Sequence, residues 1–177
     1  MSSTKVITGP KTRFSYANVF EPKSINGGDA KYSVSLLIDK KDKKTLDKIE
    51  AAVQAAIEEG KGKWGGKIPK KLKLPLRDGD EERDDDAYAG KMFLNANSSA
   101  KPGVVDEDLN PIMDADEFYS GCFGRASVNF YAFNSNGSVG IACGLNNLQK
   151  LADGDRLSGG ASAEEDFGAI EDEDDLL

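Results

Sequence analysis

Three short stretches of this sequence carry the residue types of a ligand-binding or reactive site. The first, Gly60-Lys-Gly-Lys-Trp-Gly65, matches the G-x-G-x-x-G spacing of loops that bind the pyrophosphate of a dinucleotide. Such a loop follows a strand and opens a helix, so that its backbone N–H groups point at the phosphates. Here the glycines follow a helical pattern and precede a proline-bearing segment, so the spacing does not predict a dinucleotide site.

The other two stretches are acidic. Oxygen-bearing side chains occupy five ligand positions of a calcium-loop pattern, namely Asp106, Asp108, Asn110, Asp114 and Glu117. Position 6 of that loop requires glycine, whereas Pro111 stands there and its fixed φ prevents the sharp turn. In the run 84–86 three adjacent aspartates diverge, and nothing places them against a base or a cation. We therefore expect no metal and no cofactor.

Histidine is absent, which removes the commonest general base and the commonest ligand of transition metals. Catalytic triads and histidine-bound zinc are thereby excluded, and we do not expect an enzyme. The two cysteines, Cys122 and Cys143, lie in apolar runs typical of strands, and without a secretory signal we expect buried free thiols. No apolar run approaches the roughly 18 residues of a membrane span, so we expect a cytosolic protein.

Aromatic rings alternate with cationic and amide side chains along two predicted strands. Phe93 shares a face with Lys91 and two asparagines, and Tyr131 and Phe133 share a face with Arg125. Such a face is typical of a platform on which unpaired bases stack, each stack contributing about 1–3 kcal/mol whatever the base. The alternative is that the helix or the basic segment described next covers these rings.

A basic segment, residues 60–77, carries seven cations and no acid: Lys61, Lys63, Lys67, Lys70, Lys71, Lys73 and Arg77. It also contains glycines, prolines and the only tryptophan, Trp64, a composition that predicts a loop or arm. Lysines of this kind neutralise phosphates and release counterions. The indole either stacks on a base or fastens the arm to the body.

Charge is distributed unevenly along the chain. Residues 164–177 hold eight acidic residues and no basic one, which equals the net charge of −8 of the whole chain. Of the remainder, residues 1–77 hold 17 basic and 8 acidic side chains, and residues 78–163 hold 6 basic and 15 acidic ones. A cationic half joined to an anionic tail predicts that the tail competes with a polyanionic ligand, and nucleic acid is the polyanion we expect.

Periodicity predicts the elements that must position these residues. Alternating apolar residues indicate strands at 11–20, 31–39, 91–97, 103–105, 122–133 and 138–145. Helical spacing indicates one amphipathic helix over 42–59, with Asp42 as N-cap and Gly60 at its end. The rings expected in the core are Phe14, Tyr16, Tyr32 and Phe130. The order of elements predicts a mainly β chain with one or two helices, either a small antiparallel barrel or an α+β sheet.

Long ordered blocks of the sequence resemble a known family. They begin at Thr8-Gly9-Pro10-Lys11 and include KWGGKIP, LPLRDGDEER, YAGKMFLNANS, DEFYSGCFGRASVNFYAFN and GIACGLNNLQKL, and the match spans about residues 5–168. This family comprises single-stranded-DNA-binding proteins of phages and prophages, formerly a domain of unknown function. The resemblance implies an OB-fold related to phage replication single-strand-binding proteins, a five-stranded antiparallel Greek-key barrel into which the basic arm is inserted.

Two parts of the chain are expected on this basis. Residues 1–160 form the OB-fold single-stranded-DNA-binding domain, and residues 161–177 form a disordered acidic tail. The resemblance implies that this tail contacts replication or recombination proteins. The tail residues expected to bind that partner are Glu171, Asp172, Glu173, Asp174, Asp175, Leu176 and Leu177. Many tails of this functional class end in phenylalanine, whereas this chain ends in two leucines, a departure that bears on the partner's pocket.

The predicted function is sequence-nonspecific binding and protection of single-stranded DNA in phage replication and recombination, in the cytoplasm of the bacterial host. The residues expected to contact DNA are Lys11, Arg13, Lys61, Lys63, Trp64, Lys67, Lys70, Lys71, Lys73, Arg77, Lys91, Phe93, Arg125, Tyr131 and Phe133. A second copy of the chain, as a homodimer, is a further candidate partner. Two alternatives stay open: a recombination mediator that anneals complementary strands, and an acidic protein-interaction module that does not bind DNA.

Overall fold

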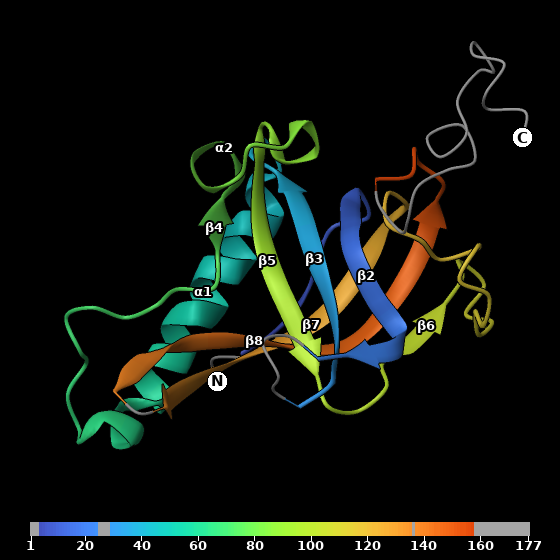
Figure 1. The fold of residues 1–177 in the computed structure, drawn as a ribbon. Helices are drawn as coiled ribbons and strands as arrows, with labels where there is room; N and C mark the ends of the chain where they lie inside the picture. The colour runs from blue at the N-terminus through green and yellow to red at the C-terminus, as the bar shows by residue number, and fades with distance from the viewer. Residues whose placement is uncertain (1–3, 25–28, 136, 158–177) are drawn as a thin grey trace, which may run out of the picture.

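Five long strands curve into a ring that makes up most of the protein (Figure 1). They are β2 (Thr12–Lys23), β3 (Lys31–Asp39), β5 (Lys91–Ser98), β7 (Phe123–Ser135) and β8 (Ser138–Ala152). The computed structural model describes residues 4–24, 29–135 and 137–157, so the expected acidic tail lies outside the described residues. No helix within these ranges has the length and apolar character that crossing a bilayer requires.

The ring closes through pairings between strands that are far apart in the sequence. β2 pairs with β3, β3 with β5, β7 with β8 and β7 with β2, all in antiparallel orientation. The closing pair, β5 and β8, is parallel and has one paired position, Asn97 opposite Gly144. The predicted mainly β barrel of OB type is therefore confirmed. The closing pair is parallel because an odd number of strands cannot alternate in direction all the way round a ring.

Two short strands extend the sheet beyond this ring. β1 (Lys5–Ile7) pairs antiparallel with β7, and β6 (Gly103–Val105) pairs parallel with β8. The strand predicted at 103–105 is therefore confirmed. The strand β1 was not predicted from the sequence.

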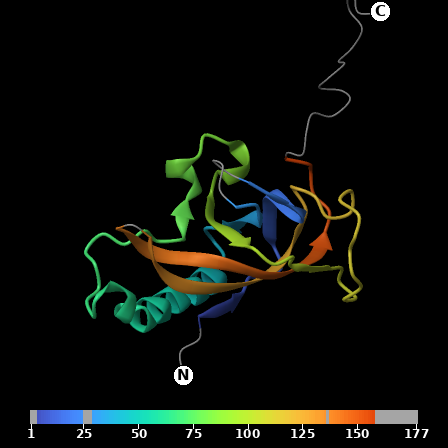
Figure 2. The same cartoon turned by 60° about the horizontal axis from the view of Figure 1, so that its bottom comes forward.

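The helix predicted over 42–59 is α1 (Lys43–Glu59), and both of its predicted ends are confirmed. The Asp42 side chain accepts a hydrogen bond from the Thr45 N–H, and the Gly60 N–H donates to the carbonyls of Ala56 and Ile57. Its apolar face packs against the barrel, and Figure 2 shows α1 running beside the long β7–β8 hairpin. In Figure 1 its upper end lies behind β3 and β5, so it does not cover the face of these two strands that is turned toward the viewer.

The paired strands β7 and β8 place alternate residues in the core, as predicted. Their buried side chains include Ala126, Val128, Phe130, Ile141, Cys143 and Leu145, and Cys122 is buried directly before β7. Both cysteines are free thiols, as expected. Burial raises the pKa of both, that of Cys143 to about 12, so neither is a nucleophile at neutral pH.

The alternation of β2 breaks at Tyr16, and one core prediction is wrong there. Phe14 and Ser15 are both buried, whereas Tyr16 is 50% exposed and has a φ of 47°. The register with β3 shifts between Ser15 and Asn18, which is the signature of a β-bulge. The bulge adds one residue to β2. The Tyr16 ring, which strict alternation would place in the core, therefore points outward. Tyr32, also expected in the core, is only partly buried.

A segment between the arm and β5, residues 77–90, folds over part of the outer face of β3 and β5. It contains β4 (Arg77–Asp78), α2 (Gly79–Glu82) and a 3-10 turn (Asp86–Tyr88). Tyr88 packs edge-on against Phe93, with ring centroids 5.1 Å apart, and both belong to a small second core with Leu37. The Tyr88 hydroxyl donates to Ser35 Oγ at 3.0 Å. We call residues 77–90 the covering segment.

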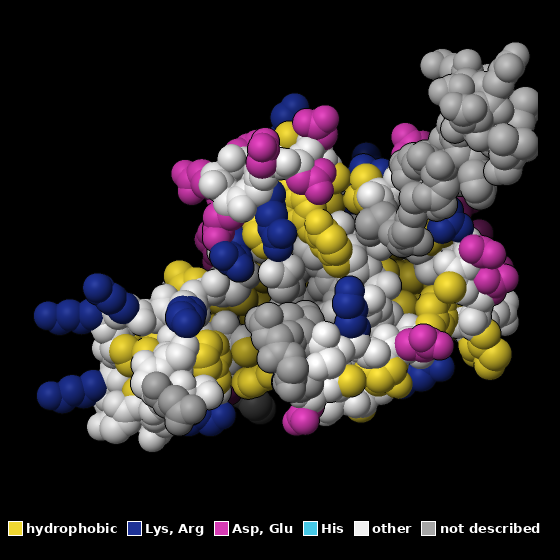
Figure 3. All heavy atoms as spheres, in the orientation of Figure 1, with side chains coloured by type: hydrophobic (Ala, Val, Ile, Leu, Met, Phe, Trp, Pro, Cys, Tyr) yellow, Lys and Arg dark blue, Asp and Glu magenta, His cyan; other side chains and the backbone are white. Residues whose placement is uncertain are grey.

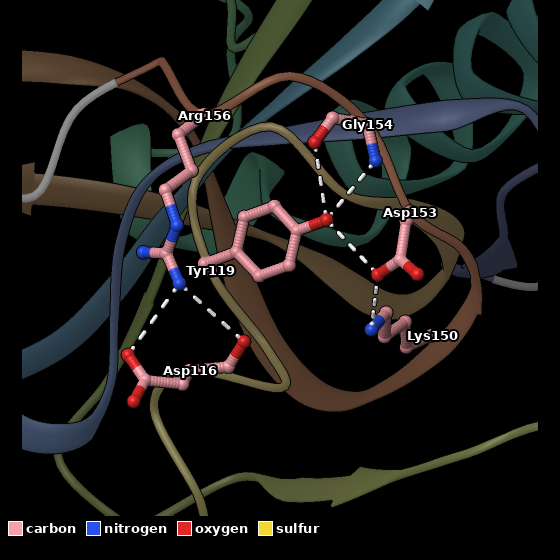
Figure 4. Close-up of polar contacts among 6 residues, drawn as sticks. All are labelled: Asp116, Tyr119, Lys150, Asp153, Gly154 and Arg156. Atoms are coloured by element: carbon pink, nitrogen blue, oxygen red, sulfur yellow. Dashed lines mark hydrogen bonds and ion pairs between the residues drawn. The ribbon is translucent and has the colours of Figure 1, made fainter.

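The last described residues, 153–157, are fastened to the loop that precedes β7 (Figure 4). The Tyr119 hydroxyl donates to Asp153 at 2.9 Å and accepts from the Gly154 N–H at 3.1 Å. Hydrogen bonds from Lys150 and then from Tyr119 hold the pKa of Asp153 below its ordinary value. The Arg156 guanidinium lies 4.6 Å from the centre of the Tyr119 ring. Residues 153–157 are therefore held against the body at a defined position.

We expect Phe118→Ala to lower the free energy of unfolding by about 3–5 kcal/mol. Phe118 is buried, and its ring centroid lies 4.9 Å from that of Phe14 and 6.4 Å from that of Phe20, so its loss leaves a cavity between the loop and β2. Urea denaturation measures the change. Met113→Ala, in the same loop at an 86% exposed position, is the control and should shift stability by less than about 0.5 kcal/mol. Equal effects of the two substitutions would contradict this packing.

Candidate nucleic-acid interface

A groove of about 630 Å³ lies on the outer face of β2, β3 and β5, beside the covering segment. Along β3 and β5, apolar residues that point into the barrel alternate with serines and asparagines that point outward. The outward residues form this face. Figure 3 shows a hollow over these strands, with Lys and Arg side chains around it and acidic side chains gathered over α2. We call this hollow the β2–β3–β5 groove.

Two side chains that face each other mark one end of this groove. Tyr16 lies there, and the Arg83 guanidinium is 5.9 Å from the centre of its ring. A positive φ in a residue other than glycine costs on the order of 1–3 kcal/mol and persists where the surrounding structure enforces it, often at binding sites. The bulge therefore keeps the Tyr16 ring exposed to solvent at a cost in free energy. Packing of the core does not account for this position of the ring.

Amide side chains line the floor of the groove. The Asn18 side chain donates to the Tyr16 carbonyl at 3.2 Å and lies 3.4 Å from Ser33 Oγ. The side chains of Asn95 and Asn97 make no hydrogen bond within the described ranges, although both line the groove. An amide donates and accepts hydrogen bonds, so these two groups can pair with the polar edge of any base.

The opposite end of the groove is cationic. Lys23 and Lys31 both line it and are paired across β2 and β3 in the register of the sheet. Like charges directly opposite each other on paired strands are destabilising, so this end attracts an anion. Asp29 is the one carboxylate among the lining residues, and no ion pair joins it to either lysine in the described structure.

The prediction that Phe93 is an exposed stacking ring is wrong. Phe93 is fully buried beneath Tyr88 of the covering segment, so it cannot meet a base. The alternative considered from the sequence was that the helix or the basic arm covers the ring. The cover is Tyr88, together with Arg77 at the end of the arm, whose guanidinium lies 5.7 Å from the centre of the Phe93 ring. Its two neighbours on the same face, Asn95 and Asn97, do reach the groove.

Several cations predicted to contact phosphates already have partners within the protein. Arg125 donates twice to Gln149, at 2.9 and 2.6 Å, and Arg13 donates to the carbonyls of Gly121 and Asp155. Ion pairs join three further predicted cations to carboxylates: Lys61 to Glu58, Arg77 to Glu82 and Lys91 to Asp39. Lys11 is exposed at the turn before β2. The structure therefore does not bring the predicted cations together in one cleft.

The basic arm is attached to the end of the β7–β8 hairpin. Trp64 Nε1 donates to the Phe133 carbonyl at 3.0 Å, Lys63 Nζ donates to the Ala132 carbonyl at 2.8 Å, and the Trp64 ring packs on the core. The sequence left two roles for the indole, stacking on a base or fastening the arm to the body. These contacts support the second role. Lys73 pairs through its backbone with Gly140, which ties down the other end of the arm. Its exposed side chain and those of Lys67, Lys70 and Lys71 have no partner among the described residues.

Tyr131 lies on β7, beyond the rim of the groove. It is 42% exposed, and its ring lies against Gly144, where an added Cβ would come within 3.4 Å of it. Gly144 is paired with Asn97 at the rim of the groove. Because Gly144 has no side chain, the surface between Asn97 and Tyr131 stays open. Phe133, two residues further along β7, is half-buried beside Trp64.

Sequence reasoning missed several residues of the groove, chief among them Tyr16, Arg83, Lys23 and Lys31. The bulge hid Tyr16, since periodicity assigned that position to the core. One signal for Arg83 was present, because it is the only cation within the acidic run 78–86. The two lysines flank a turn, where a charged residue is ordinary and carries no signal.

Comparison with known proteins gives a consistent family. A profile of the family described as Enterobacter phage Enc34, ssDNA-binding protein, matches residues 4–177. Protein p50 of Acyrthosiphon pisum secondary endosymbiont phage 1 is 35% identical over 175 residues, covering 93% of this chain and 90% of that protein.

Solved structures share the fold at lower identity. The single-stranded-DNA-binding protein from bacteriophage Enc34, in complex with ssDNA, superposes with a TM-score of 0.76 at 22% identity, covering 88% of this chain and 90% of that one. The single-stranded-DNA-binding protein gp2.5 of bacteriophage T7 superposes with a TM-score of 0.61 at 13% identity, covering 97% of each chain. These likenesses establish the barrel, and the profile match over nearly the whole sequence establishes the relationship. The chain therefore belongs to the family of the single-stranded-DNA-binding protein of Enterobacter phage Enc34.

Proposed function

We propose that this chain binds single-stranded DNA without strong sequence preference, in the β2–β3–β5 groove, and serves phage DNA replication or recombination in this way. The observation that carries the proposal is the exposed ring of Tyr16 at a groove with free amides and unpaired cations. Family membership supports it, since the family is described by single-stranded-DNA binding. The chain is not an enzyme, because its homologues bind DNA and do not catalyse a reaction.

Lack of sequence preference follows from the groups that the groove offers. Stacking on a tyrosine ring is indifferent to which base stacks, since every base has a π-face. The amides of Asn95 and Asn97 both donate and accept, so they do not select one pattern of base edge. The strand continues from the groove over Gly144 to Tyr131 and then to the lysines of the arm, whose charge supplies sequence-independent affinity.

The acidic tail competes with DNA for this surface and, once displaced, recruits replication or recombination proteins. Its starting point supports competition, because Leu157 packs beside the second core under the covering segment, next to the groove. Residues 158–177 number twenty, and an extended chain of that length reaches roughly 66–72 Å at about 3.3–3.6 Å per residue. That reach is ample for the tail of a domain of this size to meet its own cationic surface.

The proposal predicts retention of oligothymidine with a strong dependence on salt. If about five phosphates are neutralised, the logarithm of the binding constant falls with the logarithm of salt at a slope of roughly −3.5, taking about −0.7 per phosphate. Changing Lys67, Lys70 and Lys71 together to Gln should reduce that slope by roughly 2, because three phosphate contacts are lost. Filter binding at several salt concentrations measures both values.

The matched control for the arm is Lys43, Lys44 and Lys48 changed together to Gln. These lysines are exposed on α1 and do not line the groove, and their substitution removes the same charge. An equal loss of slope in the control would show a general charge effect. Failure of the unaltered protein to retain oligothymidine would favour the protein-interaction module.

We expect Tyr16→Asn to weaken binding of oligothymidine by about 1–3 kcal/mol, because the stacking ring is lost. Asparagine tolerates a positive φ better than tyrosine, so the free energy of unfolding should stay the same or rise by up to about 1 kcal/mol. Fluorescence titration and urea denaturation give the two numbers.

Leu109→Asn is the control for Tyr16→Asn, because Leu109 also has a positive φ, of 68°, and is 68% exposed in a loop outside the groove. It should relieve the same backbone strain without changing DNA affinity. A normal affinity of Tyr16→Asn would mean that this ring does not touch the bases.

Deleting residues 164–177 should tighten binding of single-stranded DNA, most strongly at low salt, where the competing charges are screened least. A second variant, with the eight tail carboxylates changed to amides at unchanged length, should bind as tightly as the deletion variant. Titration at two salt concentrations compares them. An affinity at low salt equal to that of the intact chain would count against competition by the tail.

A further inference from the structure

The Arg83 side chain lies against aromatic rings and does not pair with the acidic side chains around it. Its guanidinium lies 5.9 Å from the ring centre of Tyr16, 5.3 Å from that of Tyr88 and 5.2 Å from that of Phe93. Its side chain makes no hydrogen bond or ion pair within the described ranges, although residues 78–86 include seven carboxylates. A guanidinium stacks through its face and directs its N–H donors outward in its plane, so these donors remain available to a ligand.

The charges near Arg83 determine which part of a DNA strand can approach it. Glu81, Asp84 and Asp86 are exposed, and no cation pairs with their side chains in the part of the chain that the structure describes. A phosphate at Arg83 would lie near these carboxylates and be repelled by them. A base carries no net charge, and its face can stack on a guanidinium or on a tyrosine ring.

The far end of the β2–β3–β5 groove has the opposite character. Lys23 and Lys31 face each other across β2 and β3, and nearby there is only Asp29 to offset their charge within the groove. Two facing ammonium groups repel each other until an anion lies between them, and a backbone phosphate supplies that anion.

We propose that Arg83 and Tyr16 form a base-binding subsite, and that Lys23 and Lys31 hold the sugar-phosphate backbone at the other side of the groove. This inference rests on the proposed function and adds the orientation of the strand. The bases turn toward the covering segment and the phosphates turn away from it.

The covering segment holds Arg83 in place before any ligand arrives. Lys40 at the end of β3 pairs with Asp78 at 2.8 Å and with Asp80 at 2.7 Å, and Asp80 also accepts from the Gly90 N–H at 3.0 Å. The hydrogen bonds from Lys40 lower the pKa of both carboxyls, so the pairs persist at neutral pH. A contact group that is ordered in advance loses less entropy on binding.

The experiment compares two probes on the full chain, oligothymidine and an abasic deoxyribose-phosphate oligomer of the same length. Arg83→Gln should lower the affinity for oligothymidine by about 2- to 30-fold, the range that a cation–π contact of about 0.5–2 kcal/mol gives at 1.4 kcal/mol per tenfold. It should leave the affinity for the abasic oligomer and the salt slope unchanged. Lys31→Gln should lower the affinity for both probes by the same factor and reduce the salt slope by about 0.7.

Arg83→Lys keeps the charge but loses the planar group, so it should behave as Arg83→Gln does with oligothymidine, and it tests the inference even if the glutamine variant is unstable. A loss of salt slope in Arg83→Gln, or an equal loss with both probes, would assign Arg83 to a phosphate and overturn the inference. Unchanged affinity of both variants for both probes would also overturn it. Failure of the unaltered protein to bind either probe would instead contradict the proposed function.

Discussion

The packing of Tyr88 on Phe93 is the contact on which the binding surface depends. The long helix α1 does not cover the outer face of β3 and β5, and the covering segment shields only the end of this face that bears Leu37 and Phe93. The hydrogen bond from Tyr88 to Ser35 sets where the cover stops. Beyond that point serine and asparagine face solvent and form the floor of the groove. The same contact places Arg83 at the boundary, so a local apolar cluster sets both the extent of the groove and the group at its rim.

Regular elements could be predicted from the sequence, because their signals are local. The strand 31–39 and the helix ending at Gly60 have the predicted bounds to within a residue, since alternation, helical spacing and end caps act within a few positions. The misassigned rings depend on features that periodicity does not contain. A bulge reverses the faces of β2 from Tyr16 onward, and the cover on Phe93 comes from a segment whose acidic composition resembles a solvated loop.

The cations that can bind DNA differ from those that stabilise the fold in having no hydrogen-bond or ion-pair partner within the described part of the protein. Arg13 and Arg125 lie on strands and donate to carbonyl or amide oxygens of the barrel, so their guanidinium groups are already oriented by the protein. The arm lysines Lys67, Lys70, Lys71 and Lys73 and the pair Lys23 and Lys31 have no such partner among the described residues. A count of basic residues along the chain does not distinguish these two sets, because the partners come from distant positions.

The parallel junction between β5 and β8 has a consequence for how the barrel moves. Every other junction of the ring has more than one paired position in the described chain, whereas this one has Asn97 opposite Gly144 alone. Local opening needs less free energy where fewer ladder hydrogen bonds must break, so amide protons of the residues flanking this junction should exchange with deuterium sooner than those of β3. Since Asn97 also borders the groove, the barrel is most compliant along the line where a passing strand leaves the groove for Tyr131.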